Sequence, residues 1–139
     1  MRNFLRTSEW SRAELDQMID AAGRFKRQDD QTRPLTGKSV ALVFFNPSLR
    51  TRASMQVGLY ELGGNAVALE PGGTSWTLEH REGVVMDGDK TEHVAEFVRV
   101  LGRYCAAIGS GLGCQAQLSS TRFGSAPNRS RIVIMSAMA

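Results

Sequence analysis

The residues best suited to chemistry stand directly after an apolar run: Ser48, Leu49, Arg50, Thr51 and Arg52. Ser48 is placed as the N-cap of a helix, and the first amide groups of a helix have no acceptor within it. Those amides and the positive end of the helix dipole attract an oxyanion. Thr51 adds a hydroxyl donor, and Arg50 adds a guanidinium group that can hold two phosphate oxygens. The segment therefore predicts an anion site of the phosphate type.

The two arginines of this segment are expected to have different roles. Positions two apart on a helix point in different directions, so Arg50 and Arg52 cannot easily face one ligand. We assign Arg50 to the anion and Arg52 to an ion pair within the fold. The same residues also fit an alternative in which they are ordinary capping and surface residues without a ligand.

Hydrophobic patterns on both sides of the segment define the elements that must position it. Residues 39–45 form a short, continuous apolar run, which is typical of a buried strand. Met55, Leu59 and Leu62 then recur at helical spacing, and the glycine pair at 63–64 ends the helix. The site is thus expected where a strand ends and a helix begins.

The same alternation extends along the chain. The first helix opens with a capping box formed by Ser11 and Glu14. Strands that alternate with helices indicate parallel pairing, so we predict an α/β fold with an open parallel sheet and flanking helices. The expected helices are 11–25, the one after Ser48 and one from Glu92; the expected strands are 39–45, 65–70 and 106–108.

Composition excludes several classes of protein. The hydrophobic fraction of 42% fits a globular domain, and no apolar run approaches the roughly 20 residues of a membrane span. The polar start has no apolar core for a secretory signal, so we expect a cytoplasmic protein. Cys105 and Cys114 have no histidine at zinc-ligand spacing and are expected to be free thiols, with no metal bound. The net charge of +3 comes from scattered arginines, so no nucleic-acid partner is expected.

Four further polar residues have structural interpretations. Asp87 and Asp89 flank a glycine, a pattern that marks a turn more often than a cation site. His80 and His93 have no partner in the sequence and fit solvated or capping positions better than catalytic ones.

Several segments resemble the aspartate/ornithine carbamoyltransferase family, whose carbamoyl phosphate loop reads Ser-x-Arg-Thr-Arg directly after a strand. The similarity runs from about Asn3 to Gly109, and within the family it is closest to the N-acetylornithine carbamoyltransferase branch. The segments that carry it are 44–52, the loop from Pro71 to Trp76, 85–89 and 98–104.

This resemblance implies that Ser48, Leu49, Arg50 and Thr51 bind the phosphate of carbamoyl phosphate, with Arg50 catalytic. It also implies attack of the amine of N-acetylornithine, or of a similar amino acid, on the carbamoyl carbon in arginine biosynthesis. No metal or organic cofactor is implied. Trp76 is implied to contact carbamoyl phosphate in a neighbouring subunit of a homotrimer, although a tryptophan in a Gly-rich loop also commonly covers the edge of a core.

The resemblance ends near Gly109. Relatives follow the third strand with an arginine that polarises the carbamoyl oxygen, and Gly109-Ser110-Gly111 supplies none. The family's amino-acid-binding domain does not follow either. Residues 110–139 contain none of the 14 acidic residues, although residues 131–135 could form a strand. We expect 1–109 to be an incomplete carbamoyl phosphate-binding domain and 110–139 to be an atypical tail, disordered or read out of frame in a truncated copy. A genuine short protein is the competing explanation.

Three functions remain open on these grounds. The first is the carbamoyl phosphate-binding half of a carbamoyltransferase, inactive as an isolated chain. The second is a non-catalytic anion-binding or assembly module that joins copies of itself or full-length subunits of a trimer. The third is a basic nucleic-acid binder.

Overall fold

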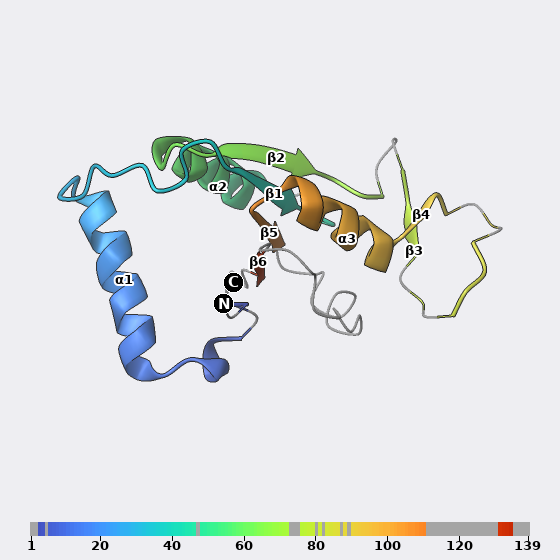
Figure 1. The fold of residues 1–139 in the computed structure, drawn as a ribbon, viewed down its shortest axis with the longest axis horizontal. Helices are drawn as coiled ribbons and strands as arrows, with labels where there is room; N and C mark the ends of the chain where they lie inside the picture. Colours follow the sequence, from blue (N-terminus) through green and yellow to red (C-terminus); the bar gives the residue numbers. More distant parts are fainter. Residues whose placement is uncertain are drawn as a thin grey trace.

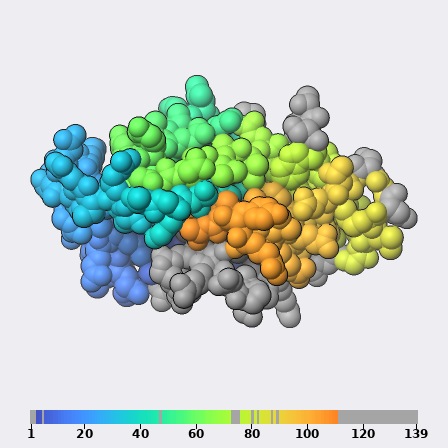
Figure 2. Space-filling view, turned by 45° about the horizontal axis from the view of Figure 1, so that its top comes forward, coloured from blue at the N-terminus to red at the C-terminus, as the bar shows by residue number. Residues whose placement is uncertain are grey.

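The computed structural model describes residues 3–4, 6–46, 48–72, 76–79, 81, 83–86, 88 and 90–110, together with the backbone of 131–134. Figure 1 shows a parallel sheet with helices beside it, a separate helix near the N-terminus and a long loop at the opposite end. The space-filling view shows the same elongated arrangement, with α1 (Arg12–Lys26) at one end and the segment from about 77 to 93 at the other (Figure 2).

Four parallel strands form the sheet, in the order β2-β1-β5-β6. In chain order they are β1 (Ser39–Val43), β2 (Asn65–Leu69), β5 (Ala107–Ser110) and β6 (Arg131–Ile134). β1 pairs with β2 on one side and with β5 on the other, in parallel register throughout. The predicted open parallel sheet is confirmed, and its three expected strands lie within one or two residues of their predicted bounds.

The fourth strand comes from the tail. β6 pairs in parallel with β5 over its whole length, from Ala107 opposite Arg131 to Ser110 opposite Ile134. The strand expected from the apolar residues after position 130 is therefore part of the sheet. Residues 111–130 and 135–139 lie outside the described part of the chain, so the expectation of a disordered tail stays untested.

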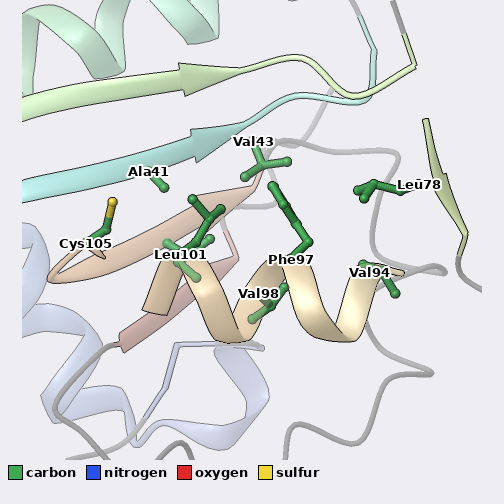
Figure 3. Close-up of a cluster of buried hydrophobic side chains, with 9 residues drawn as sticks. Ala41, Val43, Leu78, Val94, Phe97, Val98, Leu101 and Cys105 are labelled. Carbon is green, nitrogen blue, oxygen red and sulfur yellow. The ribbon is translucent and has the colours of Figure 1, made fainter. Parts of the chain in front are cut away.

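One face of the sheet is covered by α3 (Val94–Tyr104). Its apolar stripe packs against β1 and β5, and Figure 3 shows Phe97 and Leu101 pointing from the helix toward Ala41 and Val43 of the sheet. Burial of this stripe stabilises the helix far more than its intrinsic propensity does. The core cluster consists of Ala41, Val43, Leu78, Val94, Phe97, Val98, Leu101, Cys105 and Ile108.

The other face is covered by α2 (Leu49–Glu61). Met55 and Leu59 pack against a smaller cluster formed by Val40, Leu42 and Phe44. Successive residues of β1 point to opposite faces, so its buried residues Val40–Val43, followed by Phe44, supply both clusters. β1 is therefore the central strand of the structure, as the continuous apolar run predicts for a strand covered on both faces.

The first helix has the predicted start. The Ser11 hydroxyl accepts a hydrogen bond from the Glu14 amide, and the Glu14 carboxylate accepts one from the Ser11 amide, so the capping box is confirmed. However, α1 has no buried residue, and Ile19 on its apolar stripe is 67% exposed. Figure 1 shows this helix standing away from the sheet.

The sequence patterns did not predict a short 3-10 turn and a pair of two-residue strands. A single 3-10 turn, η1 (Thr7–Glu9), precedes α1, and β3 (Leu78–Glu79) pairs in parallel with β4 (Glu92–His93). Two-residue strands are too short to show a period of their own. β4 leads directly into α3, and the Nδ1 atom of His93 accepts the amide of Ala95 at the helix start. The capping position expected for His93 is confirmed.

Cys105 ends α3 with its side chain inside the larger core cluster, and it is a free thiol as expected. Burial raises the pKa of this thiol above its ordinary value of 9.0, and a hydrogen bond with the Ala41 backbone offsets only part of that effect. Ionising the thiol is therefore harder in the folded chain than in the unfolded chain.

We predict that the free energy of unfolding falls as the pH rises above about 9, because the unfolded chain ionises Cys105 first. The loss is at most about 1.4 kcal/mol per pH unit, the limit for one proton. Urea unfolding of wild type and Cys105→Ala at pH 7 and pH 10 measures it, and the variant should lose less stability between the two. Equal losses in both proteins would exclude Cys105 as the cause.

Candidate functional site

The residues singled out in the sequence lie at the carboxyl edge of the sheet, where β1 runs into α2. Ser48 is the N-cap of α2 and has a non-helical backbone, with φ −149° and ψ 82°. Its carbonyl accepts the Arg52 amide at 3.0 Å, which closes the first helical turn. The amides of Leu49, Arg50 and Thr51 precede this bond and have no acceptor within the helix. The strand-to-helix switch expected from the sequence is therefore present.

Ser48 occupies the capping position without capping through its side chain. Its hydroxyl makes no hydrogen bond to the amides of the first turn. A side-chain cap would satisfy one of these donors, so the first turn keeps its full set of amides for an external acceptor. Leu49 begins the helix with its side chain 82% exposed, and only its backbone can contribute to an anion site.

Arg50 and Thr51 complete the group. Arg50 is exposed, and within the part of the chain that the structure describes it makes no ion pair. Thr51 is half-buried beside it, and its carbonyl accepts the Ser54 hydroxyl at 3.0 Å. A guanidinium group without a carboxylate partner at the amino end of a helix is suited to bind an oxyanion.

Arg52 has a different environment. Its Nη1 atom forms an ion pair with Oε1 of Glu70, the residue that follows β2. Both side chains are partly exposed, 40% for Arg52 and 54% for Glu70, so the pair lies at the surface rather than inside the fold. This pair joins the first turn of α2 to the carboxyl end of the neighbouring strand.

Trp76 lies on the opposite face of the sheet from α2. It is half-buried and packs on the α3 core cluster, with its ring centroid 5.2 Å from that of Phe97 and the planes tilted by 49°. Its carbonyl accepts the Gly72 amide at 2.9 Å, which closes the loop after Pro71. In this chain the ring covers the edge of its own core, the second of the two roles considered for it.

Glu70 is the residue that sequence reasoning missed. It was taken only as the last position of a strand. Parallel strands end at the same edge of a sheet, so an acid at the end of 65–70 lies near the end of 39–45 if the two strands are neighbours. That topology was the available signal, but the sequence alone does not show that β1 and β2 are neighbours.

Two negative findings hold for the described residues. No group of three or more His, Cys, Asp or Glu side chains is placed to hold a metal ion. No helix in this part of the chain is both long and apolar enough to cross a membrane. The cytoplasmic location expected from the sequence stays a prediction.

Comparison with known proteins assigns the family. Residues 2–131 match the profile of the carbamoyl-P binding domain of aspartate/ornithine carbamoyltransferases. The chain belongs to the aspartate/ornithine carbamoyltransferase family. The matched region extends past Gly109, where the resemblance was expected to end, and reaches the first residue of β6.

Individual relatives agree with that assignment. The N-acetylornithine carbamoyltransferase of Xanthomonas campestris pv. campestris is 54% identical over 109 residues, which cover 78% of this chain and 32% of that protein. The N-succinylornithine carbamoyltransferase of Bacteroides fragilis is 47% identical over 72 residues, covering 52% of this chain and 23% of that protein. This family member thus spans about a third of the length of the first of these relatives.

Solved structures in the same family share the fold. A variant of N-acetyl-L-ornithine transcarbamylase complexed with PALAO superposes with a TM-score of 0.83 at 43% identity, covering 98% of this chain and 43% of that one. A second variant, complexed with carbamyl phosphate and N-succinyl-L-norvaline, gives a TM-score of 0.80 at 41% identity over the same share of this chain. The α/β architecture is therefore that of a carbamoyltransferase.

The far end of α2 depends on Gly63. This residue has φ +85°, and its amide bonds to the Tyr60 carbonyl while the next amide reaches Leu59. A Cβ atom there would lie 2.8 Å from Oγ1 of Thr36 and 3.0 Å from Cβ of Arg33. Only glycine satisfies both the backbone conformation and the space.

We predict that Gly63→Ala lowers the free energy of unfolding by more than about 1 kcal/mol, because it combines a positive φ with close contacts. Gly58→Ala is the matched control: it lies inside α2, where an added Cβ meets nothing within 4 Å. That control should raise stability by roughly 0.5–1 kcal/mol. Urea unfolding at pH 7 tests both, and a neutral Gly63→Ala would contradict the packing described.

Proposed function

We propose that this chain binds carbamoyl phosphate at the amino end of α2. The observation that carries the proposal is the exposed Arg50, which has no ion pair among the described residues, beside the open amides of the first helical turn. The first-turn amides of Leu49, Arg50 and Thr51 would hold the phosphate oxygens, with the Ser48 and Thr51 hydroxyls as further donors and the Arg50 guanidinium in a bidentate contact. The family assignment supports this choice of anion, since the matched domain is described as binding carbamoyl-P.

The reaction proposed for the complete protein is carbamoyl transfer to the amine of an N-acyl-ornithine, within arginine biosynthesis. The amine nitrogen attacks the carbamoyl carbon, a C–N bond forms, the C–O bond to phosphate breaks, and the amine proton passes to an acceptor. Phosphate leaves with the electron pair, so negative charge grows on its oxygens. Arg50 would be catalytic by stabilising, together with the helix amides, the charge that develops on the phosphate.

The acceptor amino acid is proposed from the relatives rather than from the site. The most similar of the relatives compared are named for N-acetylornithine, and a shorter match is named for N-succinylornithine. The residues assigned to phosphate binding are given no contact with the acceptor amino acid. We therefore propose that residues 1–139 alone bind the anion without transferring its carbamoyl group. Citrulline-type product formed by the purified chain from N-acetylornithine and carbamoyl phosphate would contradict this.

A second function, subunit assembly, is supported by a different feature. Three apolar side chains on the outer face of α2 are exposed: Leu49 at 82%, Val57 at 55% and Tyr60 at 72%. They lie along one side of the helix with Ala53, in a stripe that no described element covers. We propose that this stripe contacts further copies or longer subunits of the family, in the trimer that the resemblance implies. Trp76 would then reach a neighbouring anion site only by leaving its contact with Phe97.

Arg50→Ala separates the two functions. Loss of one charge-assisted contact should weaken carbamoyl phosphate binding by roughly 10- to 100-fold, as measured by isothermal titration calorimetry. The matched control is Arg103→Ala, which removes the same charge from the last turn of α3, at the opposite edge of the sheet. Sedimentation of both variants should match wild type if assembly uses the apolar stripe. Equal weakening by both variants would show that binding reflects net charge and not this site.

A further inference from the structure

We propose that Glu70 sets the anion affinity of the site by holding Arg52 away from it. The inference rests on the proposed anion site at the start of α2 and adds a tuning residue to it. Glu70 is 18 positions from Arg52 in the sequence, and the sheet brings their side chains into an ion pair. The start of α2 thus carries two arginines: Arg52 is paired with a carboxylate of the fold, and Arg50 makes no ion pair with any residue that the structure describes.

The backbone explains why Glu70 lies at this place. β1 and β2 run parallel with Val43 opposite Leu69, and the Phe44 amide donates to the Leu69 carbonyl at 2.9 Å. Glu70 therefore leaves the sheet at the same edge at which β1 turns toward Ser48. α2 starts above this edge, so the carboxylate faces the first turn of the helix that holds the proposed site.

Arg52 is close enough to the open amides to matter for binding. Its own amide bonds to the Ser48 carbonyl, so it stands one turn from the N-cap. Side chains on a helix lean toward its amino end, which directs a long arginine side chain back along the first turn. Arg52 leaves the helix in a different direction from Arg50, so it acts on the anion through its charge and not through a shared contact. Released from Glu70, that positive charge attracts an anion bound at the first turn, whereas in the ion pair it is largely cancelled.

Because the Arg52–Glu70 pair is exposed, it can open and re-form, so Glu70 and a bound anion can compete for Arg52. With 40% and 54% of the two side chains exposed, water and salt reach both charges. Exposed ion pairs are weak interactions of proteins and are screened by salt. In the proposed reaction this limit on affinity favours release of the phosphate product.

The test is calorimetric binding of inorganic phosphate to residues 1–139. Glu70→Gln keeps the shape of the side chain and should tighten phosphate binding by roughly threefold to tenfold at low salt. The gain should shrink at high salt and vanish in the Glu70→Gln/Arg52→Gln double variant. Glu61→Gln, at the far end of α2, removes the same charge and should change the affinity less than twofold.

The outcomes separate this proposal from the one on which it rests. Suppose that wild type binds phosphate, that Arg50→Ala does not, and that Glu70→Gln binds phosphate no more tightly than wild type. Only the role of Glu70 is then overturned. A gain that persists without Arg52 overturns it too, because the effect would then be general charge. If neither wild type nor Glu70→Gln binds phosphate, both proposals fail. Circular dichroism of each variant checks that it is folded.

Discussion

Burial of β1 on both faces is the constraint on which the rest of this structure depends. Its residues alternate between the α3 cluster and the α2 cluster, so neither helix has a place to pack without this strand. Parallel neighbours on both sides require crossovers that return the chain to the same edge. A helix that follows β1 must therefore begin at the carboxyl edge, and its amides are exposed there. The position of the proposed anion site is a consequence of this packing.

Charge at that edge is divided between two arginines that the sequence places only two positions apart. Arg50 has no carboxylate partner among the described residues, while Arg52 is paired with Glu70. An anion at the proposed site would therefore meet a guanidinium that has no ion pair to break among the described residues. The second arginine links the start of α2 to the end of β2 through one surface ion pair, and the proposed control of anion affinity rests on that pair.

Exposed apolar surface is concentrated on two helices of this chain. α1 has no buried residue, and the outer face of α2 carries Leu49, Val57 and Tyr60 in the open. Large apolar side chains gathered on one helix face are a feature of interaction surfaces in folded proteins. The match to the first listed relative covers 78% of this chain and 32% of that protein, so this chain is much shorter than that relative.

The sequence by itself determined the local elements and the residue types of the site. Period and capping placed α1, α2, α3 and the strands β1, β2 and β5 to within a few residues, because hydrophobic spacing and N-cap chemistry are local properties. The Ser48 to Thr51 segment was found in the same way. Local patterns cannot show the order of strands in a sheet, however. They therefore did not predict that β6 lies beside β5 or that β1 and β2 are neighbours.

Only the tertiary structure decided which charges and rings meet. It paired Arg52 with Glu70, set Trp76 against Phe97, and left the apolar stripe of α1 unburied although its pattern is that of a core helix. The physical reason is the same in each case. Helical and strand periods are set within a few residues of chain, whereas a contact between residues 18 or more positions apart depends on how the sheet aligns their backbones.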